Sequence, residues 1–491
     1  MRDHLKTFAG LLLLTMLGIL IQGYHPGLED DAYYLAAIKY DLNPHLFPHD
    51  ADFFRVLFQA TIFDKMIAFS VRGTHLPLDW TAFLWQMAAT FLILWGCWRI
   101  ARRCFSESSA QWAAVAMVAA LLTLPLSGSG LSLTDQHLHP RALATVLILA
   151  AIVAVLDRRG WLAALLLLLA FPLHLNMTPF GVSFCAFLWW GQHRDSHHAA
   201  PIQSVPAALA FLFPLGWLFE PASSTWREAE ATRHFYFLLQ WTWYEWLGVF
   251  GPIIILWLFR SVARSRGSKT FALVAESAAL FAAFQLTVAL ILMLPPPLER
   301  FRSFEPMRFL HLTYLFLALL GGGLVGRYVL NRHAWRWIVL FVPLCGGMFY
   351  AQRALYPSTV HLELPGRDPQ NAWIDAFGWI SRNTPVDSYF ALDPEYMGMA
   401  GEDYHGFRAL AERSVLADAL KDPCIVVRIP SLGPRWVRER DAQKGWRNFQ
   451  RGDFLRLRSE FGVGWVVLNE PRTAGLSCPY SNGTLAVCRV E

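Results

Sequence analysis

Residues 8–24, FAGLLLLTMLGILIQGY, are followed after a two-residue gap by residues 27–35, GLEDDAYYL. The first stretch is apolar and long enough to cross a bilayer as one helix, which takes about 20 residues. The second stretch puts three consecutive carboxylates, Glu29, Asp30 and Asp31, where that helix leaves the membrane. The apolar stretch is too long for a signal peptide and no A-x-A site follows it, so we expect a retained first membrane helix.

Similar apolar runs recur over the first two thirds of the chain. The 491 residues are 55% hydrophobic and only 16% charged, whereas about a quarter of the residues in an ordinary soluble domain are charged. The pattern predicts an α-helical polytopic membrane protein with about eleven membrane helices, at residues 7–24, 79–99, 110–126, 141–156, 161–176, 178–191, 203–219, 246–260, 271–294, 309–330 and 336–353.

Lysine and arginine predict the orientation of these helices. Alternate connecting segments are short and rich in arginine: MRDHLK, WRIARRC, DRRG, RSVARSRGSK and RYVLNRHAWR. Such segments stay on the cytoplasmic side. We therefore expect a cytoplasmic N-terminus and, with an odd number of spans, a C-terminus outside the cytoplasm.

The composition changes near residue 354. Residues 1–353 form the predicted membrane domain, with a long first external loop at 25–78, and residues 354–491 form a predicted extracytoplasmic α/β domain. Within it, residues 371–383 carry Trp373, Ile374, Phe377 and Ile380 at helical spacing. SYFAL, GWVVLN and LAVCRV are typical of short buried strands.

Three cysteines fall in the outer domain. Asn482-Gly483 is a strong hairpin signal, and a turn there would bring Cys478 and Cys488 nearly opposite each other. A disulfide between them is therefore plausible in an oxidising compartment. Two free thiols, or a bond from one of them to Cys424, are equally compatible with the sequence.

Polar residues gather in the outer loops. An acceptor hydroxyl needs a carboxylate to take its proton, and a phosphate-linked leaving group needs cations to stabilise its charge. If these loops converge, both kinds of group would meet in one cavity at the membrane face. The candidate residues are Glu29, Asp30, Asp31, Asp50, Asp52, His137, His139, Arg141, His174, Arg302 and Arg308.

The long, acidic first external loop, the many spans and the outer α/β domain together resemble the GT-C superfamily of glycosyltransferases that use polyprenyl-phosphate sugars. That group includes protein O-mannosyltransferases and lipid A aminoarabinose transferases. LEDDAYYLAAIKYDLNPHLFPHDADFF, DQHLHPRALA and FRALAERSVLADALKD resemble still more closely a group of uncharacterised bacterial membrane proteins. The resemblance implies a bacterial inner-membrane protein with a periplasmic or extracellular C-terminal domain.

The resemblance also implies roles for residues. The base, or its neighbour, would be Asp30 or Asp31, with Glu29 beside it, and a second acidic position would fall on Asp50 or Asp52. The expected partners are a polyprenyl-phosphate sugar and the bilayer, and the acceptor is left open. No metal ligand is assigned, because metal dependence varies across the superfamily and a divalent cation remains possible. Arg141, Arg302 and Arg308 are the candidates for stabilising the leaving phosphate.

Two other functions are compatible with the sequence. A transporter or flippase needs ionisable groups near mid-membrane, and Glu276 and Gln285 are the main candidates, both explicable as packing contacts. A non-catalytic scaffold would bind a partner through its outer domain. The small net charge of +5 argues against a nucleic-acid partner. Gly322 and Gly326 have the GxxxG spacing of a close helix contact.

The predicted topology can be tested with reporter fusions after residues 265 and 400. We expect a cytoplasmic signal from the first fusion and an external signal from the second, because arginine-rich loops are retained inside. Identical signals at the two positions would rule out the topology.

Overall fold

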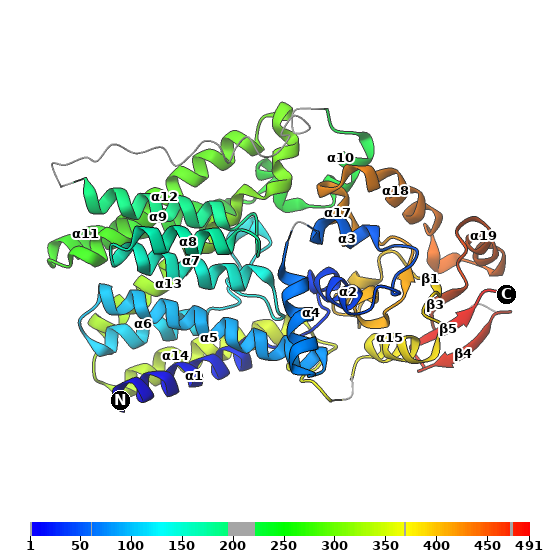
Figure 1. Cartoon of the computed structure of the whole chain (residues 1–491), viewed down its shortest axis with the longest axis horizontal. Helices are drawn as coiled ribbons and strands as arrows, with labels where there is room; N and C mark the ends of the chain where they lie inside the picture. Colours follow the sequence, from blue (N-terminus) through cyan, green and yellow to red (C-terminus); the bar gives the residue numbers. More distant parts are fainter. Residues whose placement is uncertain (1, 60, 195–220, 368–369, 472–474) are drawn as a thin grey trace.

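The computed structural model describes residues 2–59, 61–194, 221–367, 370–471 and 475–491. Long helices lie side by side in one half of the molecule, and a small sheet with short helices forms the other (Figure 1). The helices of the first half are α1 (Arg2–Gln22), α5 (Leu78–Cys104), α6 (Ser108–Ala120), α7 (Pro140–Leu156), α8 (Gly160–Ala170), α9 (Thr178–His193), α11 (Trp243–Ser265), α12 (Lys269–Met293), α13 (Leu310–Val325) and α14 (Ala334–Leu355).

Six stretches of helix in the described residues are long and apolar enough to cross a membrane. They are α1, α5, α11, α12, α14 and the stretch around α13 that continues to Leu330. α6, α7, α8 and α9 are shorter, with 13, 17, 11 and 16 residues. Each predicted span corresponds to one of these ten helices except 203–219, which lies outside the described residues. The molecule is thus a helical membrane protein, and the number of crossings stays a prediction.

The arginine-rich connections lie together at one end of the helices. Arg103 Nη2 is 2.6 Å from Asp157 Oδ2, and Arg327 Nη2 is 3.2 Å from Glu107 Oε1. The sheet domain lies at the opposite end (Figure 1). This separation is the one that the charge pattern predicts, and the side of the membrane that each end faces stays a prediction.

Glycine lets α13 lie directly on α6. A Cβ on Gly322 would come within 2.7 Å of the carbonyl oxygen of Ala113, and one on Gly326 within 2.7 Å of that of Ser109. The expected GxxxG contact is confirmed, since these are backbone atoms that cannot move aside as a flexible side chain can.

Glu276 and Gln285 of α12 both make contacts within the protein, as the sequence allowed. The Glu276 carboxylate meets three arginines, Arg194, Arg260 and Arg264, at 2.7–3.1 Å. Gln285 Nε2 donates to Ser183 Oγ over 2.7 Å. The Glu276 carboxylate is thus paired with cations, and the Gln285 amide is hydrogen-bonded.

The first external loop forms α2 (Asp31–Leu42), α3 (Asp52–Phe58) and α4 (Phe63–Thr74). α2 packs against α16 (Phe407–Ala411) of the C-terminal part. Ala32 joins the same buried cluster as Trp373 and Phe377. The division of the chain at residue 353 therefore stays a prediction, because this loop shares a hydrophobic core with residues beyond it.

A five-stranded sheet organises the C-terminal part. Its order is β2 (Ser414–Val415), β1 (Tyr389–Ala391), β3 (Trp465–Asn469), β5 (Leu485–Arg489) and β4 (Ser477–Ser481). β1 runs parallel to both of its neighbours, and β5 is antiparallel to β3 and β4. The three predicted strands are confirmed as β1, β3 and β5.

The helices of this part are α15 (Ala372–Asn383), α16, α17 (Asp422–Arg428), α18 (Gly433–Ala442) and α19 (Arg451–Phe461). α15 confirms the predicted helix. Asn371 Oδ1 caps it by accepting from the backbone N–H groups of Trp373 and Ile374. Trp373, Phe377 and Ile380 are buried on one face.

The hairpin signal is also confirmed. β4 and β5 flank Gly483, which has φ +85°, and Asn482 Oδ1 accepts from the N–H groups of Thr484 and Leu485. Cys478 and Cys488 form a disulfide across the hairpin. Cys424 is free and lies on α17.

A buried charge network ties the first external loop to the C-terminal part. Arg408 contacts Asp50 Oδ2 through Nε, and its two terminal nitrogens lie 2.8 and 3.0 Å from the Asp422 carboxylate. Asp50 Oδ2 also accepts from the N–H of Val415. Since Asp50 and Asp422 are fully buried and Arg408 nearly so, each charge depends on the others for compensation.

We expect Asp50→Ala to destabilise this junction by about 3–5 kcal/mol, the usual cost of removing one partner from a buried ion pair. Asp52→Ala is the matched control, because the Asp52 side chain is 63% exposed. Thermal unfolding in detergent micelles measures the difference. Equal melting temperatures for the two variants would contradict the role of Asp50.

Candidate active site

A cavity of about 560 Å³ lies where the helices, the first external loop and the C-terminal part meet. Its walls come from segments far apart in the chain, so the loops do converge as the sequence suggested. The charged residues that line it are Glu29, Asp30, Asp135, Arg141, Arg233, Glu305, Arg308, Lys421 and Arg428. Cations and carboxylates therefore share one cavity, with one more cation than carboxylate.

Part of the Asp30 carboxylate is exposed to the cavity. It lies at the N-terminus of α2, and 43% of its side chain is exposed. Its Oδ1 is 3.2 Å from Lys421 Nζ, and its Oδ2 is 3.9 Å from His139 Nε2. Burial in the protein raises the pKa of Asp30, but Lys421, His139 and Arg308 outweigh it and hold the pKa well below its usual range. Asp30 is thus ionised near neutral pH.

Glu29 and Asp31, the acidic neighbours of Asp30, differ from it in their contacts. Glu29 has φ +55°, lines the cavity and pairs with Lys421. Asp31 is 5% exposed, and its Oδ2 accepts from the N–H of Gly27 over 2.6 Å. Burial raises the pKa of Asp31. Asp31 is absent from the cavity wall and its carboxylate serves the turn before α2.

The start of α7 adds a histidine and a second ion pair. His139 caps this helix, accepting at Nδ1 from the N–H of Arg141 over 2.9 Å. Burial lowers the pKa of His139 to about 4, with Asp135 and Asp30 only partly opposing it. The ring is therefore neutral at pH 7 with its proton on Nε2, toward Asp30. Arg141 pairs with Asp135 through Nη2, while its Nη1 is buried without a hydrogen-bond partner.

Burial raises the pKa of Asp135, but Arg141, His139 and His137 reverse this and lower it to about 2. Both ring nitrogens of His137 are buried without a partner, and the residue lines the cavity. Unsatisfied donors and acceptors in a cavity wall are the groups that a polar ligand would satisfy.

Two arginines of the cavity wall converge on one carboxylate. Arg308 Nε contacts Glu305 Oε2, and Arg428 Nη2 lies 2.8 Å from Glu305 Oε1. Arg308 Nη1 also lies 3.4 Å from His174 Nε2. One carboxylate cannot neutralise two guanidinium groups, so this wall has positive charge to offer an anion.

Besides Asp31 and His139, three further predicted site residues lie outside the cavity wall. Asp50 belongs to the buried network with Arg408. Asp52 is exposed, 3.8 Å from Arg435. Arg302 pairs with Glu230 and donates to the carbonyl oxygen of Met293. The structure gives each of these residues a packing or surface contact and does not bring it to the other site residues.

Lys421, Arg428 and Arg233 line the cavity but were not among the predicted site residues. Lys421 lies in FRALAERSVLADALKD, which was noted for its resemblance and not for its chemistry. No sequence pattern singles out these cations from the many other basic residues of the chain. Among the described residues, no group of three or more histidine, cysteine or acidic side chains is arranged to hold a metal ion.

Comparison with known proteins gave only distant similarity. No family model and no curated protein matches this chain. Solved structures of the Archaeoglobus fulgidus oligosaccharyltransferase align over most of it. The complex with zinc and sulfate is 13% identical, with a TM-score of 0.42, and covers 93% of this chain and 67% of that one. The form tethered to an acceptor peptide is 12% identical, with a TM-score of 0.46 and coverages of 94% and 68%.

The complex of the same archaeal enzyme, AglB, with an inhibitory peptide and a dolichol-phosphate is 12% identical, with a TM-score of 0.42 and coverages of 94% and 69%. At this distance no residue role is transferred to this chain.

Cys424 reports on access to the cavity, because it lines the wall beside Lys421 and is partly exposed. We expect a small methanethiosulfonate reagent to modify Cys424 in the purified protein, and to spare Cys97 and Cys104, which are buried. Burial raises the pKa of the Cys424 thiol, and the thiolate is the reactive form, so the rate should still be rising above pH 8.5. Mass spectrometry of the peptides measures both effects. Modification of Cys97 at the rate of Cys424 would contradict the assignment.

Proposed function

We propose that this protein is a GT-C-type membrane glycosyltransferase, which transfers a sugar from a polyprenyl-phosphate donor to an acceptor outside the cytoplasm with inversion at the anomeric carbon. The observation that supports this most is the position of Asp30. Its carboxylate faces a cavity at the membrane exit of α1, and the wall of the same cavity carries surplus positive charge at Arg308 and Arg428. The resemblance of the first external loop to the GT-C enzymes points to the same chemistry.

The reaction would be a single displacement. Asp30 accepts the proton of the acceptor hydroxyl as its oxygen bonds to the anomeric carbon, and the bond from that carbon to the phosphate oxygen breaks. The lipid phosphate leaves with the electron pair, and Arg308 and Arg428 stabilise its charge. Arg141 is a further candidate, because its unpartnered Nη1 is available to an anion.

The low pKa of Asp30 is compatible with this role. A transition state at an anomeric carbon has oxocarbenium character, so the attacking hydroxyl becomes strongly acidic as its bond to carbon forms. A weak base then suffices, provided that it is ionised and close to that hydroxyl. His139 lies beside Asp30 and is neutral at pH 7. It would therefore not compete with Asp30 for the proton of the acceptor hydroxyl.

The remaining assignments belong to the same proposal. The arginine-rich ends of the helices face the cytoplasm of a bacterium, the inner membrane holds the helices, and the cavity and the C-terminal part lie outside. Glu29, His137, His139 and His174 line or adjoin the cavity, and we propose that they contact the donor or the acceptor.

The test is transfer by purified protein in lipid nanodiscs, supplied with a panel of polyprenyl-phosphate sugars. We expect Asp30→Asn to lower turnover by at least ~10²-fold, the scale of general-base catalysis, while the protein remains folded and inserted. The amide keeps the shape of the side chain but removes the basic oxygen.

Asp31→Asn separates the two candidate bases. Its amide oxygen can still accept from Gly27, so we expect a much smaller loss than for Asp30→Asn. If neither variant nor the double variant affects transfer, the carboxylates are not catalytic. A chain that transfers no sugar from any donor would favour the scaffold.

A further inference from the structure

We infer that Lys421 is a positioning residue for Asp30: the C-terminal part inserts this ammonium group behind the first-loop carboxylates, balances their charge and aims them into the cavity. The inference rests on the proposed function for its catalytic meaning. The contact itself is a property of the fold and can be tested without a substrate.

The exposed fractions of the Lys421, Glu29 and Asp30 side chains indicate how the three groups are arranged. Lys421 Nζ contacts Glu29 Oε2 and lies 3.2 Å from Asp30 Oδ1. The lysine side chain is 9% exposed, whereas Glu29 and Asp30 are 38% and 43% exposed. All three residues line the cavity, and the cation is more deeply buried than the two carboxylates. A buried ammonium group is tolerated only when paired in this way, so the pairing restricts where both carboxylates can point.

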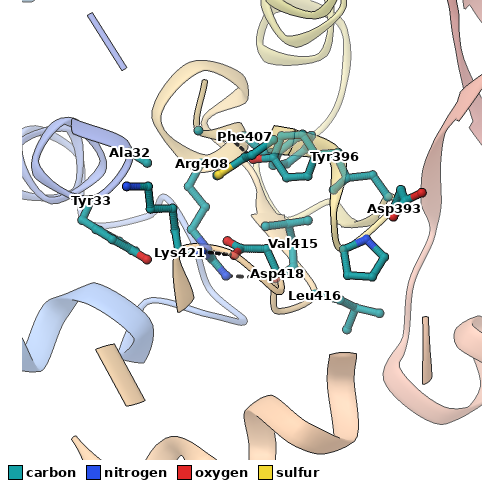
Figure 2. A pocket seen from close by; sticks show the side chains of 14 residues that line it. Ala32, Tyr33, Asp393, Tyr396, Phe407, Arg408, Val415, Leu416, Asp418 and Lys421 are labelled. Atoms are coloured by element: carbon teal, nitrogen blue, oxygen red, sulfur yellow. Dashed lines mark hydrogen bonds between the residues drawn. The ribbon is translucent and has the colours of Figure 1, made fainter. Parts of the chain in front are cut away.

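The backbone around Lys421 is held by a second set of contacts. Asp418 Oδ1 accepts from the N–H groups of Leu420, Lys421 and Asp422. Asp422 in turn pairs with Arg408, which contacts Asp50 of the first external loop. Figure 2 shows Lys421, Arg408 and Asp418 beside Tyr33 of α2. The first external loop therefore helps to hold Lys421 in place through Asp50, and it also supplies Glu29 and Asp30, the carboxylates that Lys421 contacts.

The charged and titratable groups around Asp30 come from several elements. They are Glu29 and Asp31 beside it, Tyr34 on α2, His139 at the start of α7, Arg233 before the 3-10 turn at His234–Tyr236, Glu305 and Arg308 before α13, and Lys421 and Cys424 of the C-terminal part.

Among these groups Lys421 exerts the largest opposing effect to burial on the pKa of Asp30. Loss of the lysine charge removes the largest effect that opposes burial, so the pKa of Asp30 should rise. The carboxyl group would then hold its proton at pH values where the wild type is ionised. The shift expected for losing one close opposite charge is about 1–3 pH units.

Carbodiimide labelling at a series of pH values tests this directly, because the reagent modifies protonated carboxyl groups. Mass spectrometry of the peptide containing Asp30 gives the pH of half-maximal modification in the full-length protein. We expect this midpoint to rise by about 1–3 units in Lys421→Met. Lys444→Met is the matched control: Lys444 is an exposed lysine of the same C-terminal part, so the midpoint should not move. An unchanged midpoint in Lys421→Met would overturn the inference.

Two further variants keep the test decisive if Lys421→Met fails to fold. Lys421→Arg retains the charge and should keep the midpoint within about one unit of the wild type. In Glu29→Gln, Asp30 is the one first-loop carboxylate left to pair with the Lys421 ammonium group. The pH of half-maximal labelling of Asp30 should therefore fall. A midpoint that rises in Glu29→Gln would contradict the inference independently of Lys421.

The activity readouts separate this inference from the proposed function. If the protein transfers sugar, the acid limb of the pH profile should move upward in Lys421→Met, and added ethylammonium should restore part of the activity of Lys421→Ala. An unmoved acid limb in active protein would refute the positioning role. If no donor is used but the labelling midpoint shifts, the ion pair is established and the proposed function fails.

Discussion

The contact of Lys421 with Glu29 and Asp30 joins the two halves of this molecule at the point where α1 leaves the membrane. It spans 391 positions of the sequence between Asp30 and the lysine. The lysine ammonium group is largely buried, and a buried charge is costly unless an opposite charge compensates it. The position of the C-terminal part on the helices is therefore coupled to the orientation of the acidic cluster, and a change in one must affect the other.

The same constraint organises the rest of the cavity. Asp135 pairs with Arg141, and Glu305 meets both Arg308 and Arg428. Asp135, Glu305 and Arg308 lie in connections between helices. Arg141 lies in the first turn of α7 and Arg428 ends α17, so several elements supply the charges of one cavity. Arg141 Nη1 and the ring of His137 lack partners within this arrangement. In the network around Asp50, each charge is enclosed and meets an opposite charge.

The sequence predicted the elements better than it predicted the contacts. Long apolar runs, the Asn482-Gly483 turn and the periodicity of residues 371–383 depend on neighbouring residues. Within the described residues, the structure contains the helices, the hairpin and the strands that they indicate. The convergence of His137, Arg141, His174 and Arg308 could also be anticipated, because alternate connections of a helical bundle meet at one end.

The assignment of individual charges could not be predicted in the same way. Asp30 and Asp31 are adjacent, and the positive φ of Glu29 together with the Gly27 turn decides which one faces the cavity. Asp50 has the same chemistry as Asp30, yet its partner is Arg408, 358 positions away. Arg302 and Arg308 flank the same span, and only Arg308 reaches the cavity. These outcomes depend on long-range packing, which no local pattern encodes.

The most direct test of the account is the location of a bound lipid phosphate. An electron cryomicroscopy map of the protein in nanodiscs with a polyprenyl phosphate would locate it. The account predicts phosphate density in the cavity, within hydrogen-bond reach of Arg308 or Arg428 and facing the Asp30 carboxylate. Phosphate density outside this cavity, with the cavity itself unchanged, would contradict the account.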